Sequence, residues 1–506
     1  MLRAGPRLLL LCTLLISCGG SDLPIHPYIV AGTPEQVVLI TVGGLRADHM
    51  RSYSYGPKRE VPEAIRRDIS SYRISEIFDP GVVFDNVQAS SSQSAPSLAT
   101  IFTGLIPSKH GVLENGQRLA ESVPSMASVF KDAGYQTAAI LGAAHLESVA
   151  TGFDEVVAER AHATQVRLEA TRWLRKRRTS QRFFLWVHFS DVRDWYMSYK
   201  PGRWANYTEK EEQVRDAAKG TRVTNYRYFS HLHGLPELHD PAEFEPVDFG
   251  ARPNRNGLMS EFKASDYETV LNWFDRYDGR LAHVDLEVRE LVKVVEELGL
   301  SGRKLYMFTS DHGEALGDHG YVGHDRDLYE AQLRVPLLMR FSGGDRPVGR
   351  VRHQVRHTDL FFTMAQMLGR DLNSFHPAPD GESLLPLLPG AAGADRAEAR
   401  VAYAERQPVD DLRRELGWTD ERVWSVRTPE FRLIVREEGE DELYKMVGRP
   451  REAMNLAGQD HPAEAALRKL LAERLEWVES HPDEIPAAGE PEQRWLSELV
   501  MLGERR

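Results

Sequence analysis

A short polar run at the end of an apolar segment is the clearest candidate for chemistry in this sequence. Residues 309–314 hold an aspartate and a histidine side by side, Asp311 and His312, directly after the apolar run 305–308. A hard carboxylate and an imidazole at the end of a buried strand can bind a divalent cation. They also suit a capping aspartate followed by a surface histidine. Spacing alone leaves both interpretations open.

Two further groups combine histidines with other potential ligands, but neither has the spacing of a strong metal motif. For the group that follows Asp311 a charged, solvated loop is the simpler interpretation, and we prefer it over a second metal site. That group is Asp318, His319, Asp325 and Asp327. The other group is His231, His233 and His239.

The elements that must position these residues alternate between two kinds. Short β-branched or apolar runs indicate buried strands, and segments with helical spacing lie between them. The expected strands are 36–42, 82–84, 137–141, 183–187, 305–308 and 335–339. The expected helices are 125–133, 163–176, 267–298 and 358–368. Such alternation predicts an α/β fold, with a mostly parallel sheet covered on both faces and ligands at the carboxyl ends of its strands.

The alternation stops in two places. Residues 190–262 are polar, aromatic and rich in Gly, Pro and His, which indicates an insertion over the strand ends where substrate selection could reside. Residues 390–399 are rich in Ala and Gly and resemble a linker. Beyond this linker, the runs 423–427 and 431–435 predict antiparallel strands, and a helix is expected from about 462 to 481. We therefore expect a small C-terminal α+β subdomain over 400–506.

Composition and charge narrow the classes of partner. The chain of 506 residues has a formal net charge of -12. No segment is dominated by a stripe of Lys and Arg, which argues against nucleic acid as a partner. An anionic substrate would therefore need a local positive site.

The N-terminus has the order of an export signal. Two arginines precede an apolar run that is too short to span a bilayer, and Cys18 follows Leu15-Ile16-Ser17. This order predicts a signal peptide over 1–17, lipidation at Cys18 and a tether over 18–34. The alternative is an ordinary signal peptide with an incidental cysteine. The lipid-anchored form would lie in the cell envelope, on the periplasmic side of a bacterial outer membrane or on the cell surface.

Several motifs, taken together and in order, resemble those of sulfatases of the alkaline phosphatase superfamily. The run 310–314, followed by 317–320, 323–324, 328–330 and 334–337, is similar to the second metal-ligand block of that family. The runs 94–97, 103–105 and 107–111 resemble its nucleophile block. Further agreement lies at 45–49, 277–279, 357–360 and 380–384. The resemblance covers nearly the whole mature chain.

This resemblance implies a fold and a set of site residues. The fold would be an alkaline-phosphatase-like three-layer sandwich over 35–390. In the family a Cys or Ser becomes formylglycine, which attacks sulfur while calcium and basic side chains hold the sulfate. Ser94 matches that nucleophile, although a serine before a proline also suits a helix N-cap. The resemblance assigns the other roles as follows: His145 and His188 catalytic, His324 substrate-binding, Asp311 and His312 metal-binding.

The sequence departs from the family pattern at positions that matter. Gly43-Gly44 stands where the family has carboxylate ligands, Leu98 replaces the arginine of the nucleophile block, and Ala143 replaces a lysine. Arg193 stands at the second histidine of the motif that His188 opens. Calcium needs about 6 to 8 oxygen ligands, so manganese or zinc, which accept fewer ligands and imidazole, remain alternatives.

Two functions follow from the resemblance and its departures. The first is a lipid-anchored hydrolase of sulfate or phosphate esters, acting on a sulfated or phosphorylated small molecule or glycan. The second is a non-catalytic lipoprotein of the same fold that binds an anionic glycan or a protein. Retention of Ser94, His188, Asp311, His312 and His324 favours the enzyme.

Overall fold

The computed structural model describes most of the chain after the N-terminal segment. Cys18 and the expected signal peptide lie outside the described residues, as do most of the insertion and the histidines at 231, 233 and 239. The described residues are 26–30, 32–53, 71–177, 181–193, 247–253, 259–264, 267–320, 322–392, 399–407, 421–447, 452 and 454–486. Among them, no helix is both long and apolar enough to cross a membrane.

A nine-stranded, mostly parallel sheet organises the larger part of the molecule, with β1 (Gln36–Val42) near its centre. β1 pairs in parallel with β5 (Phe183–Phe189) on one side and with β8 (Lys304–Ser310) on the other. The strand order is β11-β2-β12-β8-β1-β5-β3-β4, with β13 paired to β2. The remaining strands are β2 (Val82–Gln88), β3 (Gln136–Leu141), β4 (Glu155–Ala158), β11 (Arg334–Val335), β12 (Leu337–Phe341) and β13 (Gly349–Arg356).

One expected strand differs from the prediction. The run 335–339 is divided at Pro336 into the end of β11 and the start of β12, and both strands run antiparallel to their neighbours. Proline has no N–H to give to a ladder, which explains the break. An apolar run carries no signal of strand direction, so only the paired neighbours could reveal it.

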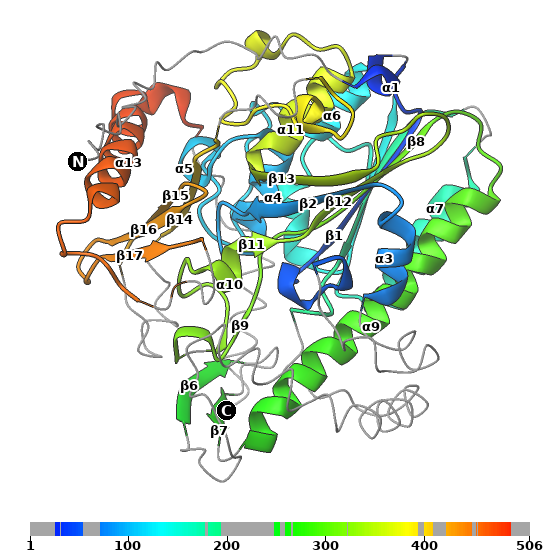
Figure 1. Ribbon diagram of the computed structural model, residues 1–506. Helices are drawn as coiled ribbons and strands as arrows, with labels where there is room; N and C mark the ends of the chain where they lie inside the picture. The colour runs from blue at the N-terminus through cyan, green and yellow to red at the C-terminus, as the bar shows by residue number, and fades with distance from the viewer. Residues whose placement is uncertain are drawn as a thin grey trace, which may run out of the picture.

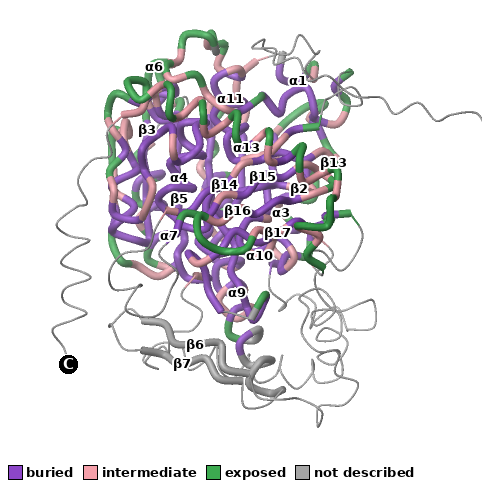
Figure 2. The backbone as a smooth tube through the Cα atoms, turned by 90° about the vertical axis from the view of Figure 1, so that its left-hand side faces the viewer, coloured by how far each residue is buried: buried purple, intermediate pink, exposed green. Residues whose placement is uncertain are grey.

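Two apolar cores cover the two faces of the sheet, because alternate residues of each strand point to opposite faces. Val37 and Leu39 enter one core, and Val38 and Ile40 enter the other. The first core packs under α4 (Ser94–Thr103), α6 (Met126–Asp132) and α11 (Thr358–Met367). The second packs under α3 (Tyr72–Phe78), α7 (Ala163–Arg175) and α9 (Tyr267–Glu297). Figure 1 shows the resulting three layers, and Figure 2 shows the buried interior between them, which confirms the predicted sandwich.

A separate antiparallel sheet forms the C-terminal part, as predicted. Its order is β14 (Ala402–Arg406), β15 (Val423–Arg427), β16 (Phe431–Arg436) and β17 (Glu442–Lys445). α13 (Pro462–Ser480) packs on this sheet through Leu467 and Leu471 (Figure 1). The other helices are α1 (Pro27–Val30), α5 (Pro107–His110) and α10 (Glu330–Leu333). The other strands are β6 (Val247–Pro253), β7 (Met259–Ala264), β9 (Ala315–Leu316) and β10 (Val322–Gly323). The 3-10 turns are η1 (Ala47–His49), η2 (Arg51–Tyr53), η3 (Ala144–Val149), η5 (Asp318–Gly320), η6 (Leu372–Ser374), η7 (Leu385–Leu387) and η9 (Pro482–Glu484).

Candidate active site

The carboxyl ends of three neighbouring strands meet at one edge of the large sheet. Val42 of β1 lies opposite Phe189 of β5 and Ser310 of β8 in the two parallel registers. The residues that follow these strands therefore lie side by side. Gly43 and Asp311 are brought together in this way, which places the expected chemistry where parallel sheets bind their ligands.

Asp311 is fixed rigidly at this edge. Its Oδ1 accepts hydrogen bonds from the backbone N–H of Gly44 at 3.0 Å and of His312 at 2.7 Å. Burial raises the pKa of the Asp311 carboxyl, but the nearby His312 and His188 and the hydrogen bonds outweigh it and hold the pKa below its usual range. The carboxylate is therefore ionised at neutral pH.

Ser94 and His312 form a hydrogen-bonded pair. Ser94 is the first residue of α4 and is buried, with its Oγ 3.2 Å from His312 Nε2. The other ring nitrogen of His312, Nδ1, lies 2.8 Å from the Gly313 carbonyl and must carry the proton to bond with it. Nε2 is then the acceptor, and Ser94 donates to it. Gln93 occupies the N-cap position, so Ser94 is not a helix cap.

Two other predicted histidines, His188 and His145, lie near these residues. Nδ1 of His188 lies 2.9 Å from Thr41 Oγ1, which itself accepts from the Trp186 indole at 2.8 Å. Burial, together with Arg193 and His312, lowers the pKa of His188 to about 4 despite the opposing charge of Asp311. Burial also places the pKa of His145 well below its usual value, and Arg193 and His188 lower it further. Both rings are therefore neutral at pH 7.

His324 directly follows β10 and lies beside His312. Its ring lies 4.6 Å from that of His312, centroid to centroid, and its Nδ1 is 2.7 Å from Glu314 Oε2. Both residues are buried. The structure thus brings all six predicted site residues of the fold together. Their roles stay predictions.

Arg193 is the site residue that the sequence did not assign. It follows β5, and its Nη1 donates to Ser94 Oγ at 3.4 Å. Its charge also helps to lower the pKa values of His145 and His188. The signal was present, since Arg193 stands at a departure from the family pattern. In the sequence, this position indicated only the loss of the family's second histidine, and not the gain of a cation.

His357 was likewise not assigned. It precedes α11, and its Nδ1 lies 3.2 Å from Ser97 Oγ. Ser97 donates in turn to the Asp311 carbonyl. Burial lowers the pKa of His357 to about 4. His357 therefore braces the turn that carries Asp311, a role that depends on contacts between distant segments.

The side chains around Asp311 do not fit a calcium ion. Gly43 and Gly44 supply no side-chain oxygen, and Asp311 Oδ1 already accepts two backbone hydrogen bonds. Asp311 Oδ2, which is buried and has no hydrogen-bond partner in the described part of the chain, remains as a single carboxylate ligand. Both nitrogens of His312 are engaged, one by Ser94 and one by Gly313. Throughout the described part of the chain, no group of three or more His, Cys, Asp or Glu side chains is arranged to hold a metal. Calcium takes about 6 to 8 oxygen ligands, far more than this pocket offers.

Two other positions that depart from the family pattern, Leu98 and Ala143, belong to the apolar core. Leu98 lies on α4 with 0% of its surface exposed, and Ala143 is also buried in that core. A charged side chain at either position would be costly in such surroundings unless it were paired. The core around α4 is therefore built for the apolar residues that are present.

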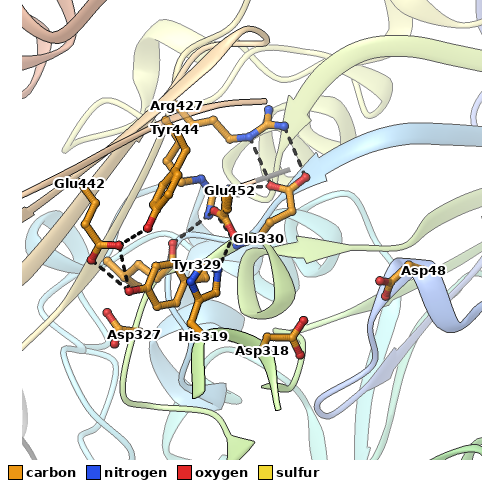
Figure 3. Close-up of polar contacts among 12 residues, drawn as sticks. Asp48, Asp318, His319, Asp327, Tyr329, Glu330, Arg427, Glu442, Tyr444 and Glu452 are labelled. Carbon is orange, nitrogen blue, oxygen red and sulfur yellow. Dashed lines mark hydrogen bonds and ion pairs between the residues drawn. The ribbon is translucent and has the colours of Figure 1, made fainter. Parts of the chain in front are cut away.

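The acidic residues that follow Asp311 contradict the expectation of a solvated loop. Asp318 is buried and accepts from Arg46 Nη1 at 2.7 Å, and Asp327 is buried and pairs with Arg436. Figure 3 shows Asp327 beside Tyr329 and Glu442, at the junction with the C-terminal sheet. Charge density in the sequence suggested solvent, but arginines distant in sequence neutralise these carboxylates.

Comparison with models of protein families shows which family the chain belongs to. The model of the family described as Sulfatase matches residues 35–370, about two thirds of the chain. The chain belongs to the sulfatase family. Family membership supports sulfuric ester hydrolase activity for this sulfatase, and the family generally uses a divalent metal.

Individual relatives agree with that assignment. An N-acetylglucosamine-6-O-sulfatase of Bacteroides thetaiotaomicron is 24% identical over 82% of this chain and 84% of its own length. A choline-sulfatase of Rhizobium meliloti is 24% identical over 61% of this chain and 64% of its own length.

Solved structures confirm the fold. A phosphonate monoester hydrolase of Agrobacterium radiobacter superposes with a TM-score of 0.62 at 19% identity, covering 88% of this chain and 95% of the other. A protein solved with its substrate D-glucosamine-2-N,6-O-disulfate superposes with a TM-score of 0.61 at 19% identity, covering 89% of this chain and 99% of the other. These structures share the alkaline-phosphatase-like architecture.

Proposed function

We propose that this sulfatase hydrolyses a sulfate ester on a glycan, with Ser94 as its nucleophile. One observation carries the proposal: the Ser94 hydroxyl lies between a histidine nitrogen that accepts its proton and a guanidinium that attracts an anion. A nucleophile paired with a base in this way is the usual arrangement for covalent hydrolysis. The glycan is suggested by the relatives, whose names include a glucosamine sulfatase and a glucosamine disulfate substrate.

The proposed hydrolysis uses side chains of this chain and one water molecule. His312 Nε2 accepts the Ser94 proton as Oγ attacks sulfur and the S–O bond to the glycan breaks. The leaving alkoxide takes a proton from water, and the hydroxide so formed attacks the sulfur and displaces Ser94. His312 then returns its proton to Ser94 Oγ, and sulfate leaves. Asp311 lies 3.6 Å from His312 Nε2 through Oδ2 and stabilises the imidazolium that forms between these steps.

His188 supplies a hydrogen-bond donor to the same pocket. Trp186 donates to Thr41 Oγ1, so the Thr41 hydroxyl can donate to His188 Nδ1. The proton of the neutral ring is then on Nε2, which faces Gly43 at the strand ends. From there His188 can donate to a sulfate oxygen.

The proposal is tested by turnover of an aryl sulfate and an aryl phosphate. We expect sulfate release by the purified full chain and its loss in Ser94→Ala, with Arg172→Gln on the surface of α7 as control. The assay is run in EDTA and with added calcium, manganese or zinc. Mass spectrometry of the peptide around Ser94 separates serine from formylglycine. Turnover that survives Ser94→Ala would refute the proposed nucleophile.

A non-catalytic role is the second candidate, and Gly43-Gly44, Leu98 and Ala143 favour it. The protein would then bind an anionic glycan or a partner protein in the same pocket. Absence of turnover on every ester and metal tested, together with retained binding of a sulfated glycosaminoglycan, would support this role over catalysis.

We further propose that the protein is exported and lipid-anchored at Cys18. The support is the order of charged, apolar and small residues before this cysteine. We expect the native chain in the membrane fraction of its host, and Cys18→Ser in the soluble envelope fraction. Membrane association that is unchanged in Cys18→Ser would contradict the anchor.

A further inference from the structure

Arg193 approaches the strand ends at the point where the two glycines lie. A Cβ built on Gly44 would lie 3.1 Å from the Arg193 Cα, and one on Gly43 would lie 3.6 Å from the Arg193 Cβ. Gly44 also has a φ of +73°, which side-chain-bearing residues rarely adopt. The glycines at 43 and 44 therefore have a structural role besides the absence of carboxylate ligands. They provide the space that lets the Arg193 backbone pack against the end of β1.

The side chain of Arg193 then extends towards the nucleophile. Its Nη1 reaches Ser94 Oγ, and its charge acts on both His145 and His188. Arg193 is half-buried, whereas Ser94 and His188 are buried. A guanidinium in such surroundings is a strong and permanent anion ligand, because it stays charged and can donate to two oxygens at once.

We propose that Arg193 is the fixed cation that binds the sulfate group in this sulfatase, in place of a divalent metal. The inference rests on the proposed function for the identity of the anion. Three observations lead to it: the donor set around Asp311 does not fit calcium, the glycines admit Arg193, and Arg193 touches the nucleophile. Arg193 would orient the ester and stabilise the charge on its sulfate oxygens during attack.

The same geometry explains why carboxylates are absent at 43 and 44. A carboxylate beside Arg193 would pair with the guanidinium and compete with the incoming sulfate. At Gly43 there is room to test this, because an added Cβ would meet His188 Nε2 and the Arg193 Cβ at 3.4 and 3.6 Å, ordinary contact distances. Gly44 offers no such test, because its conformation would strain a substituted residue.

The experiment measures binding of inorganic sulfate to the purified full chain in EDTA by isothermal titration calorimetry. We expect binding without added metal, and elemental analysis below one divalent ion per chain. Arg193→Gln should weaken sulfate binding at least tenfold. Arg193→Lys should lose less, because it keeps the charge but not the paired donors. Arg172→Gln, a surface arginine on α7, should bind as the parent chain does.

Gly43→Asp provides a second, independent test. It should weaken sulfate binding by a similar factor, and calcium should not restore it. Melting temperatures of the ligand-free variants establish that each is folded. Sulfate binding that requires calcium, or that is unchanged in Arg193→Gln, would overturn the proposal. Arg193-dependent binding without ester turnover would instead refute the proposed function and leave this inference standing.

Discussion

Two regions of this sulfatase concentrate buried charged and polar side chains, and they are built differently. At the strand ends, Asp311 and Arg193 lie among neutral histidines. At the junction with the C-terminal sheet, Glu330 pairs with Arg432, Asp327 pairs with Arg436, and Glu442 accepts from Tyr329. Figure 3 shows the contact between Glu442 and Tyr329. The charged groups of the first region surround the proposed nucleophile Ser94, whereas those of the second region pair with one another.

The junction is a continuous network. Glu330 of α10 accepts from Arg432 Nη2 at 2.8 Å and lies 3.4 Å from Arg427 Nε. Glu442 of β17 accepts from the hydroxyl of Tyr329 at 3.0 Å and from Arg436 at 2.8 Å. Burial raises the pKa of the Tyr329 phenol, as do the neighbouring carboxylates. This comparison predicts that junction residues act on stability and pocket residues on binding and turnover.

The largest stability effect is expected from Glu330→Ala. The substitution leaves Arg432 and Arg427 buried without their common carboxylate. Removing one partner of such a group costs about 3–5 kcal/mol. We expect the urea midpoint of the C-terminal part to fall, while the affinity of the folded protein for sulfate is kept. An unchanged midpoint would show that water replaces the ion pairs.

The pH dependence of stability should reveal the neutral histidines of the pocket. The folded-state pKa of His188 is lowered from 6.5 to about 4, so the unfolded chain binds a proton in this range that the folded chain does not. Its stabilising contribution is complete above pH 6.5 and is lost as the pH falls towards 4. The loss is about 1.4 kcal/mol per pH unit. His188→Gln should reduce the slope of stability against pH from urea unfolding between pH 6.5 and 4.5 by the contribution of one proton, while His145 and His357 keep theirs; an identical slope in both proteins would contradict the assignment.

A matched pair of histidines tests the comparison within one loop. His319 stacks on Tyr329 at 3.6 Å between ring centroids, whereas His324 lies against His312 in the pocket. We expect His319→Ala to lower the free energy of unfolding by about 1 kcal/mol, the size of a good aromatic contact, with turnover kept. His324→Ala should instead reduce kcat/KM at least tenfold. The reverse pattern in melting curves and kinetics would break the distinction between the regions.

The smallest effect is expected from Tyr444→Phe. This hydroxyl donates to Glu442, which Tyr329 and Arg436 also contact. Losing one hydrogen bond of several should lower the free energy of unfolding by about 0.5 kcal/mol, the low end for a single hydrogen bond. Differential scanning calorimetry of the variant beside Glu330→Ala checks the order. A larger loss for Tyr444→Phe would mean that the network depends on this phenol.

The sequence predicted the large sheet and its helices well, because local periodicity controls them. The expected helix at 163–176 is α7, and the expected strand at 36–42 is β1 with the same bounds. The sequence did not reveal that the strands at 335–339 run antiparallel to their neighbours. The expectation of a solvated loop for the acidic residues after Asp311 was wrong. Both depend on which distant segment lies alongside, and a local pattern holds no information about that.

The residues of the site likewise fall into those that the sequence predicted and those that only the tertiary structure revealed. The sequence determined the family and the edge of the sheet where chemistry is expected, through the types and order of Ser94, His188, Asp311 and His312. Strand ends and motif spacing are local features, so the sequence alone reveals them. Only the tertiary structure placed Arg193 against Gly43 and Gly44 and directed it at Ser94. Close packing of two backbones decides that contact, and the residues involved are about 150 positions apart in the sequence.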